Sequence, residues 1–418
     1  MHSPVVTAYL RWALVRAALA RGWWLCTAVY LVVNAGLSSS QLILIGVFQG
    51  LTVVAAEVPA GVLADTVSRR LTLVVAHVVM GTGMALTGVV TSFATLVLSQ
   101  CIWGLGWAFS SGADVAWATD ELDRPDLIDR VLVAQGRRDL GGTGVGIVVF
   151  GLAGWVTTLA TAMISAGVAM AMLGLLVVAR WPESWQPARR RHGRSAVTRA
   201  VTRQALAIAR RDRIVGSVLV ATLVVNGGAE GFGRLFQQHL VDLGLPASPP
   251  PVVWFAAIAL LAAATGVVAL LWLEARISGV GAARRAYMAA ATAATCGVVV
   301  FAHAPSLEVA IVGSLLVSGI GLPTIRIAST VAVNRRTSSD VRATMHSLLS
   351  QSENLGEIVC GLVLAAVASQ TSPTITLTAS AVFIAVAGLL VSRTRRPRAP
   401  TRPHRREPPP PTWRRPSA

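Results

Sequence analysis

Lysine is absent from this sequence, and charge of either sign is scarce. All 36 residues in the Lys and Arg class are arginines, and only 13% of the 418 residues are charged. A soluble domain carries about 25% charged residues, so the composition excludes an ordinary soluble protein. Because the mean hydropathy is +0.63, we predict an all-α membrane protein with many spans.

Motifs for metal, disulfide and nucleotide chemistry are also lacking. No phosphate-binding loop of the GxxxxGK[ST] kind is present, and we find no nucleophile–base pair or metal-ligand cluster in a consistent position. We therefore expect no cofactor, no metal and no enzymatic activity. The four cysteines lie singly in apolar runs, which is typical of small buried hydrophobic residues: Cys26, Cys101, Cys296 and Cys360.

The net charge of +17 is distributed in a way that does not fit nucleic-acid binding. The arginines lie mostly in short connections and in the C-terminal tail, and no basic domain contains them. Positive connections on one side of a membrane are the expected cause. Nucleic acid is therefore not an expected partner.

Twelve segments are long and apolar enough to cross a bilayer, which takes about 20 residues. The first is the least regular, because its clean apolar run is short and the helix must take in Arg21. The predicted spans are residues 8–34, 41–63, 71–91, 94–119, 130–155, 158–180, 214–240, 251–274, 285–303, 307–333, 342–369 and 373–392.

The arginines of the connections predict the orientation. The connections that follow every second span carry arginine, whereas the alternate connections, such as "NAGLSSSQ" and "HAPSLE", carry none. Cytoplasmic loops of membrane proteins are enriched in basic residues. We therefore expect a multi-pass protein of the plasma membrane with both termini in the cytoplasm.

The two halves of the chain resemble each other at a single offset of 215 residues. Parallel repeats of six helices pack around an axis along the membrane normal, with the substrate site between them. The matched stretches are Arg69-Arg70 with Arg284-Arg285, Gly104-Leu105-Gly106 with Gly319-Ile320-Gly321, and Asp139-Leu140-Gly141 with Asn354-Leu355-Gly356.

The repeat divides the chain into two six-helix bundles, residues 1–182 and 213–392. An Arg-rich cytoplasmic linker, residues 183–212, joins them. The tail, residues 393–418, is rich in Pro and Arg and is predicted to be disordered. Linker and tail are both expected to lie near anionic lipid headgroups.

The connection "GVLADTVSRR" at 61–70 places a glycine, an aspartate and two arginines between apolar runs. Gly61, Asp65, Arg69 and Arg70 resemble the signature loop of the major facilitator superfamily. The stretch "VRATMHSLLSQSENLGEIVCG" at 341–361 is similar to helix 11 of drug-exporter-like branches. The resemblance covers residues 8–392 and implies two bundles that alternate access. It also implies that the loop latches the bundles in the outward-open state; the alternative is a basic turn that only sets orientation.

The sequence departs from the family pattern at two positions, which bear on proton coupling and on the direction of transport. The family's helix 4 motif carries an arginine where this chain has Gln100, which questions the usual proton-coupling arrangement. The helix 5 motif of antiporters contains proline, but the stretch 136–146 reads "GRRDLGGTGVG". This second departure weakens the case for export.

Ionisable residues inside apolar spans are costly and are candidates for substrate binding or proton coupling. Glu353 and Glu357 lie four apart, so their like charges favour a proton or a cationic partner; Arg137 and Arg138 are the alternative structural partners. The candidates are Arg21, Glu57, Asp114, Arg138, Asp139, Glu230, Arg234, Arg326, Glu353 and Glu357.

Three further predictions concern single faces of these spans. Glu230 and Arg234 share a helix face and either neutralise each other or serve transport. In the family the helix of Arg326 lines the cavity, so Arg326 is the candidate for an anionic substrate group, with a salt bridge to Asp114 as the alternative. Trp103 and Trp107 also share a face, and line an apolar substrate pocket or else face lipid and neighbouring helices.

The leading functional hypothesis is a secondary transporter that exports an amphipathic organic compound, such as a drug or secondary metabolite, in exchange for protons. The runner-up is an importer or facilitator of a small, anionic metabolite. A third reading is a membrane sensor that does not transport. The expected partners are a small-molecule substrate, protons and the lipid bilayer, and the expected state is a monomer.

Overall fold

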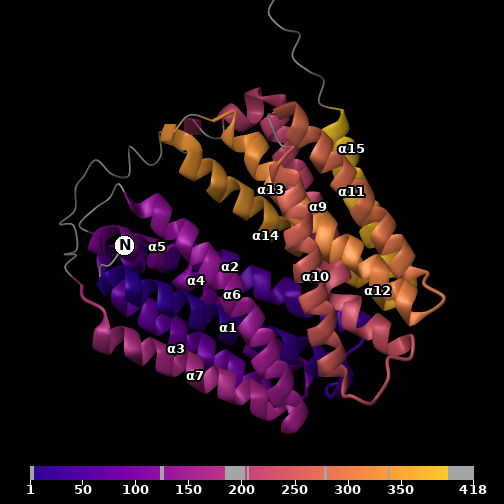
Figure 1. Cartoon of the computed structure of the whole chain (residues 1–418), viewed down its shortest axis with the longest axis horizontal. Helices are drawn as coiled ribbons and strands as arrows, with labels where there is room; N and C mark the ends of the chain where they lie inside the picture. Colours follow the sequence, from indigo (N-terminus) through magenta and orange to yellow (C-terminus); the bar gives the residue numbers. More distant parts are fainter. Residues whose placement is uncertain are drawn as a thin grey trace, which may run out of the picture.

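The computed structural model describes residues 4–122, 127–183, 203–204, 207–276, 280–337 and 339–393, and all regular structure in these ranges is helical. Figure 1 shows the helices of the first half on one side and those of the second half on the other. The first half contains α1 (Pro4–Val33), α2 (Ser39–Thr66), α3 (Arg69–Thr87), α4 (Phe93–Ser110), α5 (Ala113–Glu121), α6 (Ile128–Val156) and α7 (Leu159–Arg180).

The second half repeats this order with one added irregularity. Most of the predicted linker and nearly all of the tail lie outside the described residues. The helices are α9 (Arg213–Asp242), α10 (Pro251–Glu274), α11 (Val280–Ala302), α12 (Leu307–Leu315), the π-helical segment η2 (Leu316–Gly321), α13 (Leu322–Asn334), α14 (Ser339–Gln370) and α15 (Pro373–Ser392).

Eleven helical stretches within the described residues are long and apolar enough to cross a membrane. They include the combined stretches Phe93–Glu121 and Leu307–Asn334. Helix α1 has the length but not the composition, because it carries Arg11, Arg16 and Arg21. It is the twelfth helix by position, and it packs along α6 and α7 in the first half.

Two of the predicted spans are less regular than expected. The span 94–119 is interrupted between α4 and α5, where Gly112 adopts a φ of 80° that disfavours other residues. The span 307–333 contains η2, a π-helical insertion of a kind found often at functional sites. Hydrophobicity alone does not reveal either feature, since both segments remain apolar.

Short polar side chains begin several of the helices at the ends of the connections. The Ser68 hydroxyl accepts a hydrogen bond from the Leu71 backbone N–H (2.8 Å), and Thr158 caps α7 in the same way. The Asp212 carboxylate accepts from the Ile214 N–H at 2.8 Å at the start of α9. Such caps satisfy N–H groups that a helix leaves without partners.

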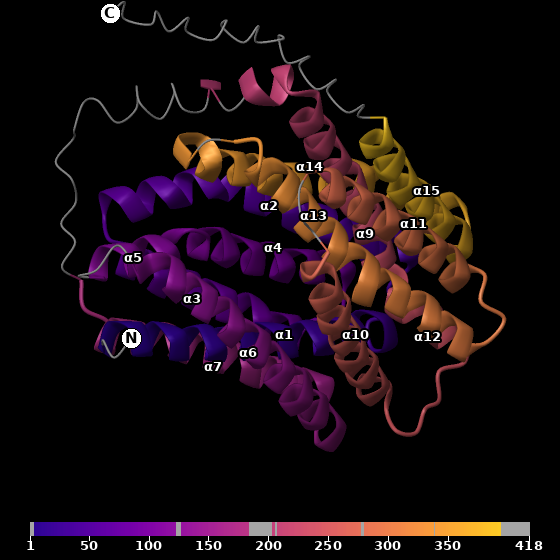
Figure 2. The ribbon, with the colours of Figure 1, turned by 45° about the horizontal axis from the view of Figure 1, so that its top comes forward.

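Glycines set the closest helix contacts within each half. A methyl group at Gly142 or Gly146 of α6 would overlap backbone oxygens of α1, and one at Gly356 of α14 would overlap the backbone of α9. In lipid, small residues let helices approach closely and gain dispersion contacts. Helices α1 and α6 therefore pair in the first half as α9 and α14 pair in the second (Figure 2).

The two halves meet mainly along α2 and α14. Gly50 of α2 faces Ile358 of α14, and at one end of the molecule Gly154 of α6 faces Val252 of α10. Beyond Glu57, towards the other end, α2 becomes exposed, with Val58 at 74%. The halves therefore touch at the end that carries the Arg-free connections, whereas much of α2 beyond Glu57 is exposed.

Candidate functional site

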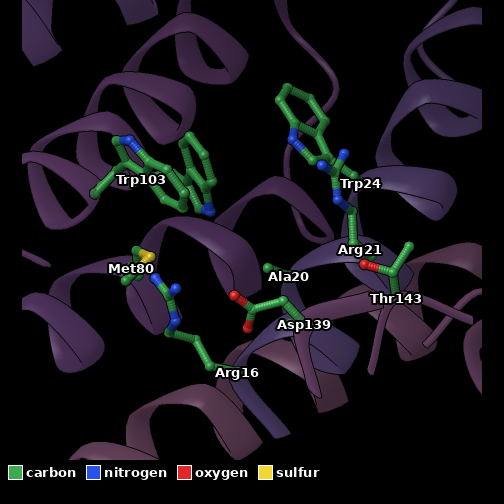
Figure 3. A pocket seen from close by; sticks show the side chains of 10 residues that line it. Arg16, Ala20, Arg21, Trp24, Met80, Trp103, Asp139 and Thr143 are labelled. Atoms are coloured by element: carbon green, nitrogen blue, oxygen red, sulfur yellow. The ribbon is translucent and has the colours of Figure 1, made fainter. Parts of the chain in front are cut away.

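A cavity of about 320 Å³ lies in the first half, between α1, α3, α4 and α6. Its wall combines a broad aromatic surface with three ionisable groups (Figure 3). The aromatic residues are Trp24, Trp103 and Trp107, and the charged residues are Arg16, Arg21 and Asp139. A concave apolar site with a few convergent polar groups is the usual form of a small-molecule site.

The tryptophans form a continuous aromatic wall. The Trp103 and Trp107 rings are stacked, with centroids 5.5 Å apart and planes at 15°. The Trp24 ring lies 5.6 Å from Trp103. Trp103 and Trp107 both line the cavity, and Trp103 also packs against the rings of Trp23 and Trp107, as the packing alternative expected. That the cavity takes substrate stays a prediction.

The charged groups of the cavity sit on two helices that the glycines of α6 hold together. Arg16 stacks over the rings of Trp12 (4.8 Å) and Trp107 (5.8 Å). Asp139 lies within electrostatic reach of Arg16 and Arg21, and Figure 3 shows its carboxylate between the two arginines. The cavity therefore places two guanidinium groups and one carboxylate beside an aromatic wall.

Three polar atoms of this wall are buried without a hydrogen-bond partner among the described residues. They are Nε of Arg16, Nε1 of Trp103 and the Oδ1 oxygen of Asp139. Buried polar atoms are nearly always paired, and each one left without a partner calls for an explanation. Two are donors and one is an acceptor, and all three are enclosed by protein atoms in this conformation.

A second polar cluster adjoins the cavity across the boundary between the halves. Arg234 of α9 donates from Nε to Glu230 at 2.6 Å and from Nη2 to Gln49 of α2 at 3.0 Å. Its guanidinium also lies 5.3 Å from the ring centre of Trp24. The predicted pairing of Glu230 with Arg234 is confirmed, and the pair joins the second half to a wall residue of the cavity.

The α14 carboxylates extend this cluster. Glu357 lies within electrostatic reach of Glu230, Arg234 and Glu353. Glu353 pairs with Arg326 of α13 at 3.4 Å. Four carboxylate and guanidinium groups from α9, α13 and α14 are thus gathered around Glu357.

Two predicted alternatives for these charges are wrong. Arg137 and Arg138 are exposed on α6, so they do not partner the α14 carboxylates. Arg326 pairs with Glu353 rather than with Asp114, which is buried in the first turn of α5. Helices α13 and α14 pack against each other in the second half, which places Glu353 within reach of Arg326, whereas Asp114 lies on α5 of the first half.

The remaining membrane candidate, Glu57, links the two halves. Its carboxylate accepts a hydrogen bond from the side-chain amide of Gln351 on α14. Gln100, at the position of the family arginine, is fully buried and donates to the Thr87 hydroxyl at 3.1 Å. Gln100 therefore joins α4 to α3 and is not among the residues that line the cavity.

The arginines of the 61–70 loop hold together the first half. Arg69 donates to the Asp120 carboxylate and to the Ala116 carbonyl oxygen, both on α5. Arg70 pairs with Glu183 at 3.5 Å, beyond the end of α7. Both arginines thus have more than an orienting role.

The other two loop residues are exposed. The Asp65 side chain is 64% exposed and lies 3.6 Å from Arg69. A Cβ added at Gly61 would meet nothing within 4 Å. The latch contact with the second bundle stays a prediction, and in this conformation Asp65 is accessible.

Sequence reasoning missed three residues of the site: Arg16, Trp24 and Gln49. Arg16 and Trp24 lie at a spacing of eight, with Ala20 between them, so the sequence places all three on one helix face. That spacing is the sequence pattern from which Arg16 and Trp24 could have been predicted. No sequence pattern points to Gln49, because its role depends on how the two halves are arranged.

Comparisons with known proteins agree with this architecture. The family model described as Major Facilitator Superfamily matches residues 13–350. No curated protein matches the sequence. The structure resembles that of the nucleoside transporter NupG, with a TM-score of 0.73 and 15% identity over 93% of this chain and 98% of that chain.

Two further solved structures are similar in fold. A bacterial homolog of the human lysosomal transporter Spinster, in an inward-facing and occupied conformation, gives a TM-score of 0.71 and 13% identity over 94% of this chain and 97% of that chain. The POT family transporter PepTSo gives 0.70 and 12% identity over 92% and 97%. At these identities the likeness shows the fold.

Proposed function

Because the chain belongs to the major facilitator superfamily, we propose that it is a proton-coupled secondary transporter that exports an amphipathic organic compound by alternating access. The cavity between α1, α3, α4 and α6 is the substrate site in this proposal. The observation that carries it is the combination of three tryptophans with two arginines and an aspartate in that cavity. An aromatic wall suits the apolar body of such a compound, and the charges suit its polar end.

The proton sites in this proposal are the carboxylates around Arg234. Glu357 is partly buried and faces Glu230, Glu353, Arg234 and Arg326. A proton added to this cluster reduces the repulsion among its three carboxylates. A proton that enters this cluster changes the charge facing Arg234, and Arg234 contacts the cavity wall through Trp24.

The Arg-rich connections support a cytoplasmic location for the 61–70 loop. In that orientation, the exposed end of α2 makes this conformation inward-open. The loop then closes against the second bundle when the transporter turns outward. Asp65 is the group proposed to make that contact, as the negative partner of a helix N-terminus.

Proteoliposomes with an imposed pH gradient test the proposal. We would measure the flux of three labelled probes of different charge: tetraphenylphosphonium, uridine and 2-naphthoate. The expected result is gradient-driven flux of one probe above protein-free liposomes, abolished by an uncoupler. Glu357→Gln should abolish gradient-driven accumulation yet retain exchange of labelled for unlabelled probe.

The results that contradict the proposal are specific. Flux of a probe that persists without a proton gradient would exclude proton coupling and favour a facilitator. Flux directed inward with the gradient would favour import, for which the departures at Gln100 and at 136–146 argue. Binding of a probe without any flux or exchange would favour a sensor.

A further inference from the structure

We infer that Gly46 of α2 positions a gate: it lets the Glu230–Arg234 pair of α9 dock on the first half, and this docking holds the Arg-free end closed. The inference rests on the alternating access of the proposed function, but not on its substrate, its direction or its coupling ion. It adds the residues that hold one of the two states. Three observations carry it: the space at Gly46, the neutral partners of Arg234 and the place of the contact along α2.

Gly46 faces the ion pair directly. A Cβ atom at this position would overlap Oε1 of Glu230 and would lie 2.8 Å from Nε of Arg234. Glycine therefore leaves the room in which the pair lies against α2. The overlapped atoms are at the ends of side chains, so a methyl group would displace the pair rather than the backbone of either helix.

The pair docks on neutral groups of the first half. Arg234 donates from Nη2 to the side-chain oxygen of Gln49 at 3.0 Å, and its guanidinium lies 5.3 Å from the ring centre of Trp24. Glu230 and Arg234 both belong to α9, so separation of the halves leaves the ion pair itself intact. An ion pair that spanned the boundary would instead leave two buried charges without partners. This contact therefore opens without that penalty, as a gate requires.

The contact between α2 and α9 extends to the Arg-free end. Ser39, at the start of α2, donates to the side-chain oxygen of Gln238 at 2.8 Å, and Gln238 lies one turn beyond Arg234 on α9. The polar contacts with α9 thus lie within residues 39–49 of α2, whereas much of α2 beyond Glu57 is exposed. The gate therefore lies at the end where the halves touch, and its release opens that end.

Double electron–electron resonance on spin-labelled protein in lipid nanodiscs tests the gate. One pair of labels, at Asn34 and Ala247, lies on connections of the two halves at the Arg-free end. A second pair, at Thr66 and Arg335, lies at the Arg-rich end. All four positions are exposed. The native cysteines are replaced by alanine in every sample.

Three variants assign the effect. Gly46→Ala should lengthen the distance at the Arg-free end and shorten the distance at the Arg-rich end. The ratio of the two populations should shift by at least about tenfold, since a hydrogen bond from a charged donor is worth roughly that factor. Gln49→Ala removes the acceptor and should shift the ratio in the same direction; it decides the matter if Gly46→Ala does not fold. The matched control is Gly233→Ala, next to Arg234, where a methyl group would meet nothing within 4 Å; it should keep the wild-type distances.

Movement of the two ends in opposite directions separates a gate from a structural role. A loss of packing would broaden the distances at both ends and lower the unfolding temperature. The inference is overturned if Gly46→Ala keeps the wild-type distances, or if the distances at both ends broaden together. Opposite shifts in a protein that gives no flux of any probe would contradict only the proposed transport function. Flux by the wild type with no shift in either variant would contradict only this inference.

Discussion

The ion pair between Glu230 and Arg234 offers a quantitative test of how the two halves are joined. The Nε–Oε1 distance is 2.6 Å, and the side chains are only 13% (Arg234) and 16% (Glu230) exposed. Arg234 also reaches Gln49 on α2 and the ring of Trp24 on α1. We consider Arg234→Met, Glu230→Gln and the double variant.

The expected magnitudes follow from burial. Removing one member of a fully buried pair costs about 3–5 kcal/mol, because a charge is left without a partner. The remaining exposure lets water screen part of this, so we expect about 2–3 kcal/mol for Arg234→Met. The double variant leaves neither member of the pair without its partner, but like Arg234→Met it loses the attraction between Arg234 and Glu357. It also loses the hydrogen bond to Gln49, worth about 1.5–3 kcal/mol. It should therefore be no less stable than Arg234→Met alone.

The assay is thermal unfolding of the purified protein in one detergent, followed by tryptophan fluorescence. The wild type should have the highest unfolding temperature and the double variant a lower one. The unfolding temperature of Arg234→Met should be equal to that of the double variant or lower. Arg213→Met, which changes an exposed arginine at the start of α9, is the control and should match the wild type. The reasoning would be refuted if Arg234→Met unfolded at the wild-type temperature. It would also be refuted if the destabilisation of the double variant equalled the sum of the destabilisations of the two single variants.

Three further predictions concern the loop, the helix contacts and the Asp212 cap of α9. Asp65→Asn should slow turnover but leave the unfolding midpoint unchanged, because the side chain is 64% exposed; normal turnover would leave the loop with an orienting role only. Gly146→Ala should cost about 1–3 kcal/mol, because the methyl overlaps a carbonyl oxygen of α1. By contrast, a methyl group at Gly144 would meet nothing within 4 Å, so Gly144→Ala should be neutral or slightly stabilising. Equal unfolding midpoints for Gly146→Ala and Gly144→Ala would contradict the packing argument. Burial opposes ionisation of Asp212, but hydrogen bonds from Arg336 and from the first turn of α9 outweigh it and lower the pKa. The stability that this carboxylate contributes is therefore complete at neutral pH and is lost as pH falls through the lowered pKa. Asp212→Asn should flatten the fall in the unfolding midpoint between pH 7 and acid, and an unchanged slope would count against this cause.

The features that could be predicted from the sequence are those that local geometry determines. The spacing of Glu230 and Arg234 places both on one turn of a helix whatever surrounds it, and their pairing was predicted. The spacing of Trp103 and Trp107 likewise places both rings on one face of their helix. Helix positions followed from apolar length, and their ends agree within a few residues with the short polar caps.

The features that could not be predicted depend on which face each helix turns inward. Lipid and protein interior are both apolar, so hydrophobicity gives little information on facing. A salt bridge to Asp114 was the alternative to substrate binding for Arg326, yet Arg326 pairs with Glu353 of α14, in its own half. Gln49 gains its role only when α9 of the other half lies beside α2.

The internal repeat gives the clearest case of sequence and structure agreeing beyond a single helix. Gly104 of α4 faces Gln49 of α2, the second helix of its half, and its counterpart Gly319 faces Thr265 of α10, the second helix of the other half. Equivalent glycines thus fill equivalent contacts, which is how a duplicated fold is maintained.

The charges do not follow the repeat, and this asymmetry bears on function. Asp139 lines the cavity of the first half, whereas its counterpart at the same offset is the neutral Asn354. The second half instead places carboxylates at Glu353 and Glu357, on either side of that position. Backbone packing has been kept in both halves while the ionisable groups have diverged. The proposed function accounts for this asymmetry by a division of labour, in which the first half would hold the polar end of the substrate and the second half would carry the proton. The substitution Asn354→Asp, which would restore the symmetric charge, should therefore alter the pH dependence of transport more than the affinity for substrate. An effect confined to affinity would place substrate binding in the second half and contradict the division.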